Sequence, residues 1–107
     1  MSQKLKTIVA VNHYLLNLAL SPYDKFYPNS IVNYDKSLDL SNVMSYLLEL
    51  KEEGIVTLKQ ERKVDDVMVE VPLNEVDKNK LDEFYPVFYL SEEYKTFVRE
   101  KHKNLLK

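Results

Sequence analysis

The chain contains a single glycine, Gly54, which ends a segment whose apolar residues recur at helical spacing. This segment, Ser41–Gly54 (SNVMSYLLELKEEG), is predicted to form a helix with one buried face. The apolar stripe consists of Val43, Leu47 and Leu50, widened by Leu40, Met44 and Leu48. Side-chain oxygens of Asp39 and Ser41 can accept hydrogen bonds from the free amides at the helix start, and glycine favours the left-handed backbone that commonly ends a helix. Both ends of the helix are therefore predicted.

The period of the pattern changes to two directly after Gly54. Side chains alternate along Ile55–Arg62 (IVTLKQER), as expected for a strand. A second strand is predicted from residues that share one face, namely Val67, Val69, Val71 and Leu73. The polar residues between the two runs, Glu61–Asp66, are predicted to form the tip of a hairpin.

Two further helices are predicted near the ends of the chain. Ser2–Leu20 carries two apolar tracks, and Ser21 is followed by a proline, which disfavours a helical conformation of the residue before it. The tracks are Ile8, Val11, Leu15 and Leu18, and beside them Leu5, Val9, Leu16 and Ala19. Ser91 is predicted to cap the last helix, whose inward-facing stripe is predicted to be Tyr94, Phe97, Val98, Lys101 and Leu105.

The segments between these elements are less clearly patterned. Asn29–Tyr34 (NSIVNY) fits a short helix or a short strand, and a helix there would make a helix-turn-helix with the helix that follows. Asn74–Tyr85 is acidic and polar and is predicted to be a loop with one helical turn. Pro86 then introduces a short strand over Val87–Leu90.

A chain of 107 residues with 45% hydrophobic and 30% charged residues is predicted to form one globular domain over 1–107. The absence of cysteine excludes disulfides and thiolate sites, and a cytoplasmic location is expected. The longest apolar stretch, Ile8–Leu20, is interrupted by polar residues and is too short to span a membrane. A homodimer is left open, because this broad apolar face can pack within one chain or across two.

Catalysis and metal binding are not expected. One glycine cannot build a glycine-rich phosphate loop, and adjacent acids such as Asp65 and Asp66 point to opposite faces of a strand rather than forming a catalytic pair. His13 has no metal-ligating side chain at helical spacing on its own face, and His102 lies among lysines. The sequence therefore predicts a protein that is not an enzyme and holds neither cofactor nor metal.

Formal charge is segregated along the chain. From Val64 to Tyr94, nine acids and two lysines give −7, whereas Lys95–Lys107 has five basic residues and one acid, giving +4. One part of the chain therefore repels polyanions and the other attracts them.

The order helix, amphipathic helix, glycine, strand, charged hairpin, strand and capped helix resembles that of the winged helix-turn-helix superfamily. Val43–Val56 (VMSYLLELKEEGIV) is similar to the recognition helix of that family running into the first wing strand. Phe88–Val98 (FYLSEEYKTFV) is similar to the exit from the wing into a helix. The resemblance extends over roughly residues 41–98 and implies an α+β fold with a β-hairpin wing.

The resemblance also implies a transcriptional regulator that binds double-stranded DNA. By position, the base-contacting residues would be Asn42, Ser45 and Tyr46, and the phosphate-contacting residues Lys59, Arg62 and Lys63. Local charge favours an alternative, because the predicted recognition helix carries three glutamates and one lysine, and glutamates repel phosphates. In that alternative the domain is a small adaptor or inhibitor that binds a protein through acidic residues including Asp65, Asp66 and Glu70.

Overall fold

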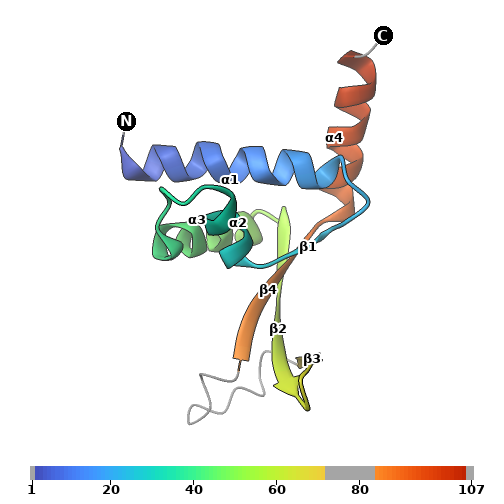
Figure 1. Ribbon diagram of the computed structural model, residues 1–107. Helices are drawn as coiled ribbons and strands as arrows, with labels where there is room; N and C mark the ends of the chain where they lie inside the picture. The colour runs from blue at the N-terminus through green and yellow to red at the C-terminus, as the bar shows by residue number, and fades with distance from the viewer. Residues whose placement is uncertain (1, 72–83, 106–107) are drawn as a thin grey trace.

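The computed structural model describes residues 2–71 and 84–105, which form an α+β fold of four helices and a four-stranded antiparallel sheet (Figure 1). The helices are α1 (Gln3–Ala19), α2 (Pro28–Tyr34), α3 (Leu40–Glu52) and α4 (Glu92–Leu105). The strands are β1 (Lys25–Phe26), β2 (Val56–Val64), β3 (Val67–Val71) and β4 (Phe84–Leu90). The predicted α+β class is confirmed, and the segment that fits either a helix or a strand is the helix α2. Most of the predicted loop after β3, residues 74–83, lies outside the described residues, as does Leu73.

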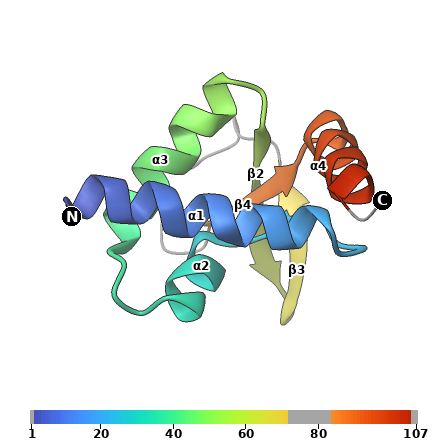
Figure 2. The same ribbon diagram turned by 90° about the horizontal axis from the view of Figure 1, so that it is seen from above.

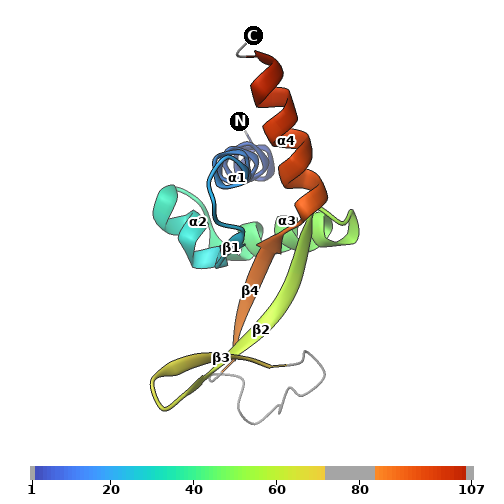
Figure 3. The same cartoon turned by 90° about the vertical axis from the view of Figure 1, so that its right-hand side faces the viewer.

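The sheet has the strand order β1-β4-β2-β3 and joins distant parts of the chain. β4 pairs with β2 over residues 56–62 of β2, and β3 pairs with residues 60–64 on the other edge of β2. β1 pairs with β4 near the helices, where Phe26 lies opposite Phe88. The outer parts of β2 and β4 form an arm that extends away from the helices (Figures 1 and 3).

The first three helices pack around the inner part of this sheet, and α1 lies across α2 and α3 (Figure 2). The core includes Val11, Leu15, Ile31, Val43, Leu47, Leu50, Val56, Phe88, Leu90 and Val98. Phe26 stacks on Phe88 within it, with ring centroids 5.8 Å apart. The buried stripe predicted for α3 is confirmed for Val43, Leu47 and Leu50, which all point into this core.

The buried face of α1 is narrower than predicted. Its buried residues are spaced four apart and form one line of Thr7, Val11, Leu15 and Ala19. Three residues of the second predicted track, Leu5, Val9 and Leu16, are 50%, 55% and 42% exposed. The prediction of two buried tracks is therefore wrong, because α1 packs against α2, α3 and α4 along one side and its other side faces solvent.

Both ends of α3 form as predicted. The Asp39 carboxylate accepts a hydrogen bond from the Ser41 amide (2.7 Å), and Gly54 has a φ of 78°. A Cβ added at Gly54 would meet no atom within 4 Å, so its cost would come from the backbone conformation.

Replacing Gly54 with alanine is expected to lower the free energy of unfolding by about 1–2 kcal/mol, the cost of a side chain in the left-handed region. Urea denaturation measures this change. Ser45→Ala, at an exposed position of α3, is the control and should change stability by less than about 0.5 kcal/mol. Equal stabilities for both variants would contradict a left-handed end to α3.

The hairpin between β2 and β3 is tighter than predicted. Glu61–Asp66 is not its tip, because β2 continues to Val64 and the turn consists of Asp65 and Asp66, with φ of 50° and 66°. Aspartate tolerates the left-handed region, and two such residues match the twist of a two-residue hairpin. Glu61 is therefore a strand residue.

The sheet contains two features that the sequence does not predict. β1 has two residues and carries no alternating pattern. β4 begins at Phe84 rather than Val87, so Tyr85 belongs to a strand and not to the predicted loop. Pro86 fits inside β4 because β1 reaches only Phe88 and Tyr89, which leaves this part of β4 at the edge of the described sheet, where a missing N–H is tolerated.

α4 begins as predicted, because the Ser91 hydroxyl accepts a hydrogen bond from the Tyr94 amide (3.2 Å). Its predicted stripe is correct for Val98, which is buried, but wrong for Phe97, which is 58% exposed, and for Lys101, which is also exposed. Lys95 is buried instead of Phe97, and its ammonium donates a hydrogen bond to the Tyr23 carbonyl (3.1 Å).

Candidate functional site

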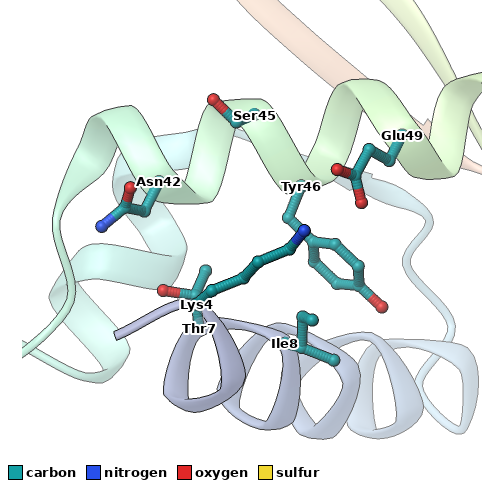
Figure 4. Close-up of a pocket in the computed structure, with 7 residues that line it drawn as sticks. All are labelled: Lys4, Thr7, Ile8, Asn42, Ser45, Tyr46 and Glu49. Carbon is teal, nitrogen blue, oxygen red and sulfur yellow. The ribbon is translucent and has the colours of Figure 1, made fainter. Parts of the chain in front are cut away.

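Asn42, Ser45 and Tyr46 line one pocket between α1 and α3 (Figure 4). This pocket has a volume of about 230 Å³ and is completed by Lys4, Thr7, Ile8 and Glu49. The Tyr46 hydroxyl donates a hydrogen bond to Asn12 Oδ1 (2.8 Å), which ties its ring to α1. Burial raises the pKa of Tyr46 above its ordinary value of 10.0, at which the hydroxyl is already a donor at neutral pH. The structure thus brings these three residues together, on the flank of α3 that faces α1.

The three cations predicted to contact phosphates lie on β2. Lys59 Nζ is 3.2 Å from Glu70 Oε1, and Lys63 Nζ is 3.6 Å from Asp66 Oδ1. Both lysines are therefore paired with acids that were candidates for a protein partner. Arg62 is half-buried, and Asp65 is exposed at the turn. Because these opposite charges lie side by side, the hairpin presents a weaker positive field than its lysines and arginine would produce without the acids.

Two groups of lysine, tyrosine and glutamate lie on the sheet face opposite Phe26 and Phe88. The inner triple is Lys25, Tyr27 and Glu61, and the outer triple is Lys59, Tyr89 and Glu70. In each, the lysine pairs with the glutamate and lies over the tyrosine ring, at 5.5 Å and 5.0 Å from the centroid respectively. In each, the tyrosine hydroxyl also donates to the same carboxylate. The triples differ in burial, because Glu61 is 4% exposed whereas Glu70 is exposed.

The Glu61 carboxylate links β1 to β2 across β4. Its Oε2 accepts a hydrogen bond from Lys25 Nζ (2.9 Å), and its Oε1 accepts one from Tyr27. Burial raises the pKa of Glu61, but these two hydrogen bonds and the charge of Lys25 more than offset it, so the pKa lies below its ordinary value. The hydrogen bond to Glu61 also raises the pKa of Lys25. Glu61 therefore stays ionised and stabilises the sheet, a role missed when the residue was predicted to lie in a polar tip.

The flank of α3 that faces away from α1, its outward side, forms an apolar surface. Leu40, Met44 and Leu48 recur there every four residues, and Leu40 and Leu48 are 42% and 41% exposed. Leu40 and Met44 open into a groove of about 180 Å³, which we call the α3 groove and which is also lined by Tyr27, Pro28, Asn29, Tyr85 and Pro86. Sequence reasoning missed it because it assigned the α3 residues to the core and Tyr85 to a loop. The available signal was the four-residue spacing beside an already complete buried stripe.

Within the described part of the chain, no three histidine, cysteine, aspartate or glutamate side chains are grouped so that they could hold a metal ion. None of the helices in residues 2–71 and 84–105 is long and apolar enough to cross a membrane. No family model matches the chain, and neither a curated protein nor a solved structure matches it. What the protein does is therefore inferred from its own surfaces.

Proposed function

We propose that the chain is a non-enzymatic, winged-helix-like protein that binds a protein partner through the α3 groove. The order α1, β1, α2, α3 and the β1-β4-β2 part of the sheet support this layout, with the outer parts of β2 and β4 as the wing. The observation that carries the proposal is the apolar column of exposed Leu40, half-buried Met44 and exposed Leu48 beside an apolar groove. Exposed apolar surfaces with polar surroundings mark interaction sites.

The charges near the groove indicate the chemistry of the partner. Lys51 and Glu52 lie one helical turn after Leu48, at the end of the column, whereas Glu49 lines the pocket that faces α1. The basic end of α4 lies beyond α1, far from the arm (Figure 1), so it adds no positive charge to the outward side of α3. A partner segment with apolar side chains fits this surface, with a lysine or arginine placed to meet Glu52 at the end of the column.

Replacing Leu48 with aspartate is expected to abolish binding of the partner. The change puts a charge into the exposed apolar column and leaves the buried stripe of α3 intact. Quantitative mass spectrometry of cell-lysate proteins retained on the immobilised full chain measures the effect. Val9→Asp is the matched control, because Val9 is 55% exposed on α1 and lies outside the apolar column of α3. A protein retained by the wild type and Val9→Asp but lost from Leu48→Asp supports the proposal, and equal retention by all three contradicts it.

DNA-binding regulation is the second candidate. It is favoured by the order of the elements and by the exposed Asn42 and Ser45 on α3. If it is right, fluorescence anisotropy should detect binding of labelled duplex DNA at low salt, and the affinity should fall steeply as salt rises. Arg62→Ala and Lys63→Ala should then weaken binding to all sequences alike. The protein-partner proposal predicts no binding of DNA at micromolar protein.

A further inference from the structure

One side of α4 packs against the C-terminal end of α1. The C-terminal half of α4 projects beyond the other helices (Figures 1 and 3). Arg99 Nε donates to the Ala19 carbonyl (3.0 Å), and its Nη2 donates to the Ser21 carbonyl (2.9 Å). Val98 is buried next to this anchor. The orientation of α4 is therefore fixed, and so is the side that it presents to solvent.

The solvent side of α4 adjoins an apolar groove. The groove has a volume of about 270 Å³ and lies between the end of α1 and α4, where it is lined by Leu16, Leu20, Tyr94, Phe97, Val98, Lys101 and His102. Phe97 is 58% exposed at its rim, and Leu16 and Leu20 are 42% and 39% exposed. Three large apolar side chains from two helices are thus exposed together.

The charges around Phe97 indicate what covers this groove. Glu93 lies one helical turn before Phe97 and Lys101 one turn after it, so the three residues form a column on α4. All three are exposed, and the Lys101 ammonium lies 5.6 Å from the centroid of the Phe97 ring. The column therefore has an acidic end, an apolar centre and a basic end.

We propose that a second copy of the chain binds here, with the two α4 helices antiparallel and a two-fold axis near Phe97. This arrangement sets Glu93 of each copy against Lys101 of the other, and it lets each Phe97 enter the groove of the other copy. A parallel arrangement would set like charges together, which opposes association. The dimer surface lies on α1 and α4 and leaves the α3 groove open, so it does not depend on the proposed function.

The first test is the mass of the full chain in solution, measured by light scattering after size-exclusion chromatography. The wild type is expected to be a dimer, and Phe97→Asp a folded monomer, because Phe97 is too exposed to contribute to the core. Val9→Asp is the control and should remain dimeric, since Val9 has a similar exposure but does not line this groove. A monomeric wild type, or a dimeric Phe97→Asp, would overturn the proposal.

Charge reversal separates this dimer from other modes of association. Glu93→Lys and Lys101→Glu should each raise the dimer dissociation constant at least about tenfold, because two repulsive pairs replace two attractive ones. The double variant should restore the wild-type constant, since the pairs are then only reversed. A double variant as weak as either single one would mean that something other than an antiparallel copy covers the groove.

Cross-linking locates the axis, since the chain has no cysteine of its own. Glu100→Cys, at an exposed position one turn after Phe97, is expected to be joined into a covalent dimer by a short bismaleimide, and Val9→Cys is expected to stay uncoupled at the same concentration. The opposite result, or equal coupling of both variants, would contradict an axis near Phe97.

Discussion

Truncating Leu47 to alanine is expected to lower the free energy of unfolding by about 2–5 kcal/mol. The Leu47 side chain is 0% exposed and lies in the core where α3 meets α1 and the sheet. The truncation removes apolar contacts and leaves a cavity that well-packed neighbours cannot fully close. Urea denaturation followed by circular dichroism measures the change.

Leu48→Ala is the matched control, because it makes the same chemical change at the next residue, which is 41% exposed. It should cost less than about 0.5 kcal/mol. Equal losses of stability would contradict the assignment of Leu47 to the buried side of α3 and of Leu48 to its exposed side. They would also contradict the position of the α3 groove.

Replacing Glu61 with glutamine is expected to cost about 1–3 kcal/mol of unfolding free energy. The change removes the charged acceptor shared by Lys25 and Tyr27 in the inner triple. The loss should fall in the lower part of this range, because the Lys25 side chain is 39% exposed and can regain water. Glu70→Gln in the outer triple is the control, and since both members of its ion pair are exposed it should cost less than about 1 kcal/mol. Equal costs would mean that Glu61 is not buried as described.

The stability difference between the wild type and Glu61→Gln should depend on pH. The pKa of Glu61 is lower in the folded chain than its ordinary value of 4.5. A carboxylate of this kind contributes stability that is fully present above the unfolded pKa and is lost as the pH falls through the folded pKa. The difference should therefore be constant near neutral pH and shrink below about pH 4. A difference that grew in acid would contradict an ionised Glu61.

The features predicted correctly from the sequence are those that depend on a short local pattern of residues. The buried stripe and both ends of α3 are correct because the stripe, Asp39 and Gly54 all lie within one short segment. Ser91 is correct for the same reason, since a cap interacts with an amide a few residues away. These features need no information about the rest of the chain.

Features that depend on distant partners are the ones that the sequence does not reveal. β1 exists because its two residues pair with Phe88 and Tyr89 at the other end of the chain. Glu61 is buried because β1 brings Lys25 and Tyr27 to it, although in sequence it belongs to a polar run. The second track of α1 is exposed because tertiary packing covers one side of that helix.

The α3 groove also combines a feature set by local pattern with features set by distant partners. The α3 wall of the groove, Leu40 and Met44, can be read from the spacing that places them with Leu48 on one side of the helix. The β4 wall consists of Tyr85 and Pro86, which reach α3 only because β4 pairs along β2. The pairing of Lys59 with Glu70 likewise needs the register of β3 on β2. Neither the groove nor the paired charges of the hairpin can therefore be seen without the sheet.

The most direct test of the central claim is amide hydrogen exchange of the full chain, measured with duplex DNA and with a protein retained by the wild type but not by Leu48→Asp. A protein partner at the α3 groove predicts slower exchange in α3 and at Tyr85 when that protein is added, and no change when DNA is added. Slower exchange along β2 with DNA, and none in α3 with the protein, would contradict a protein partner at the α3 groove.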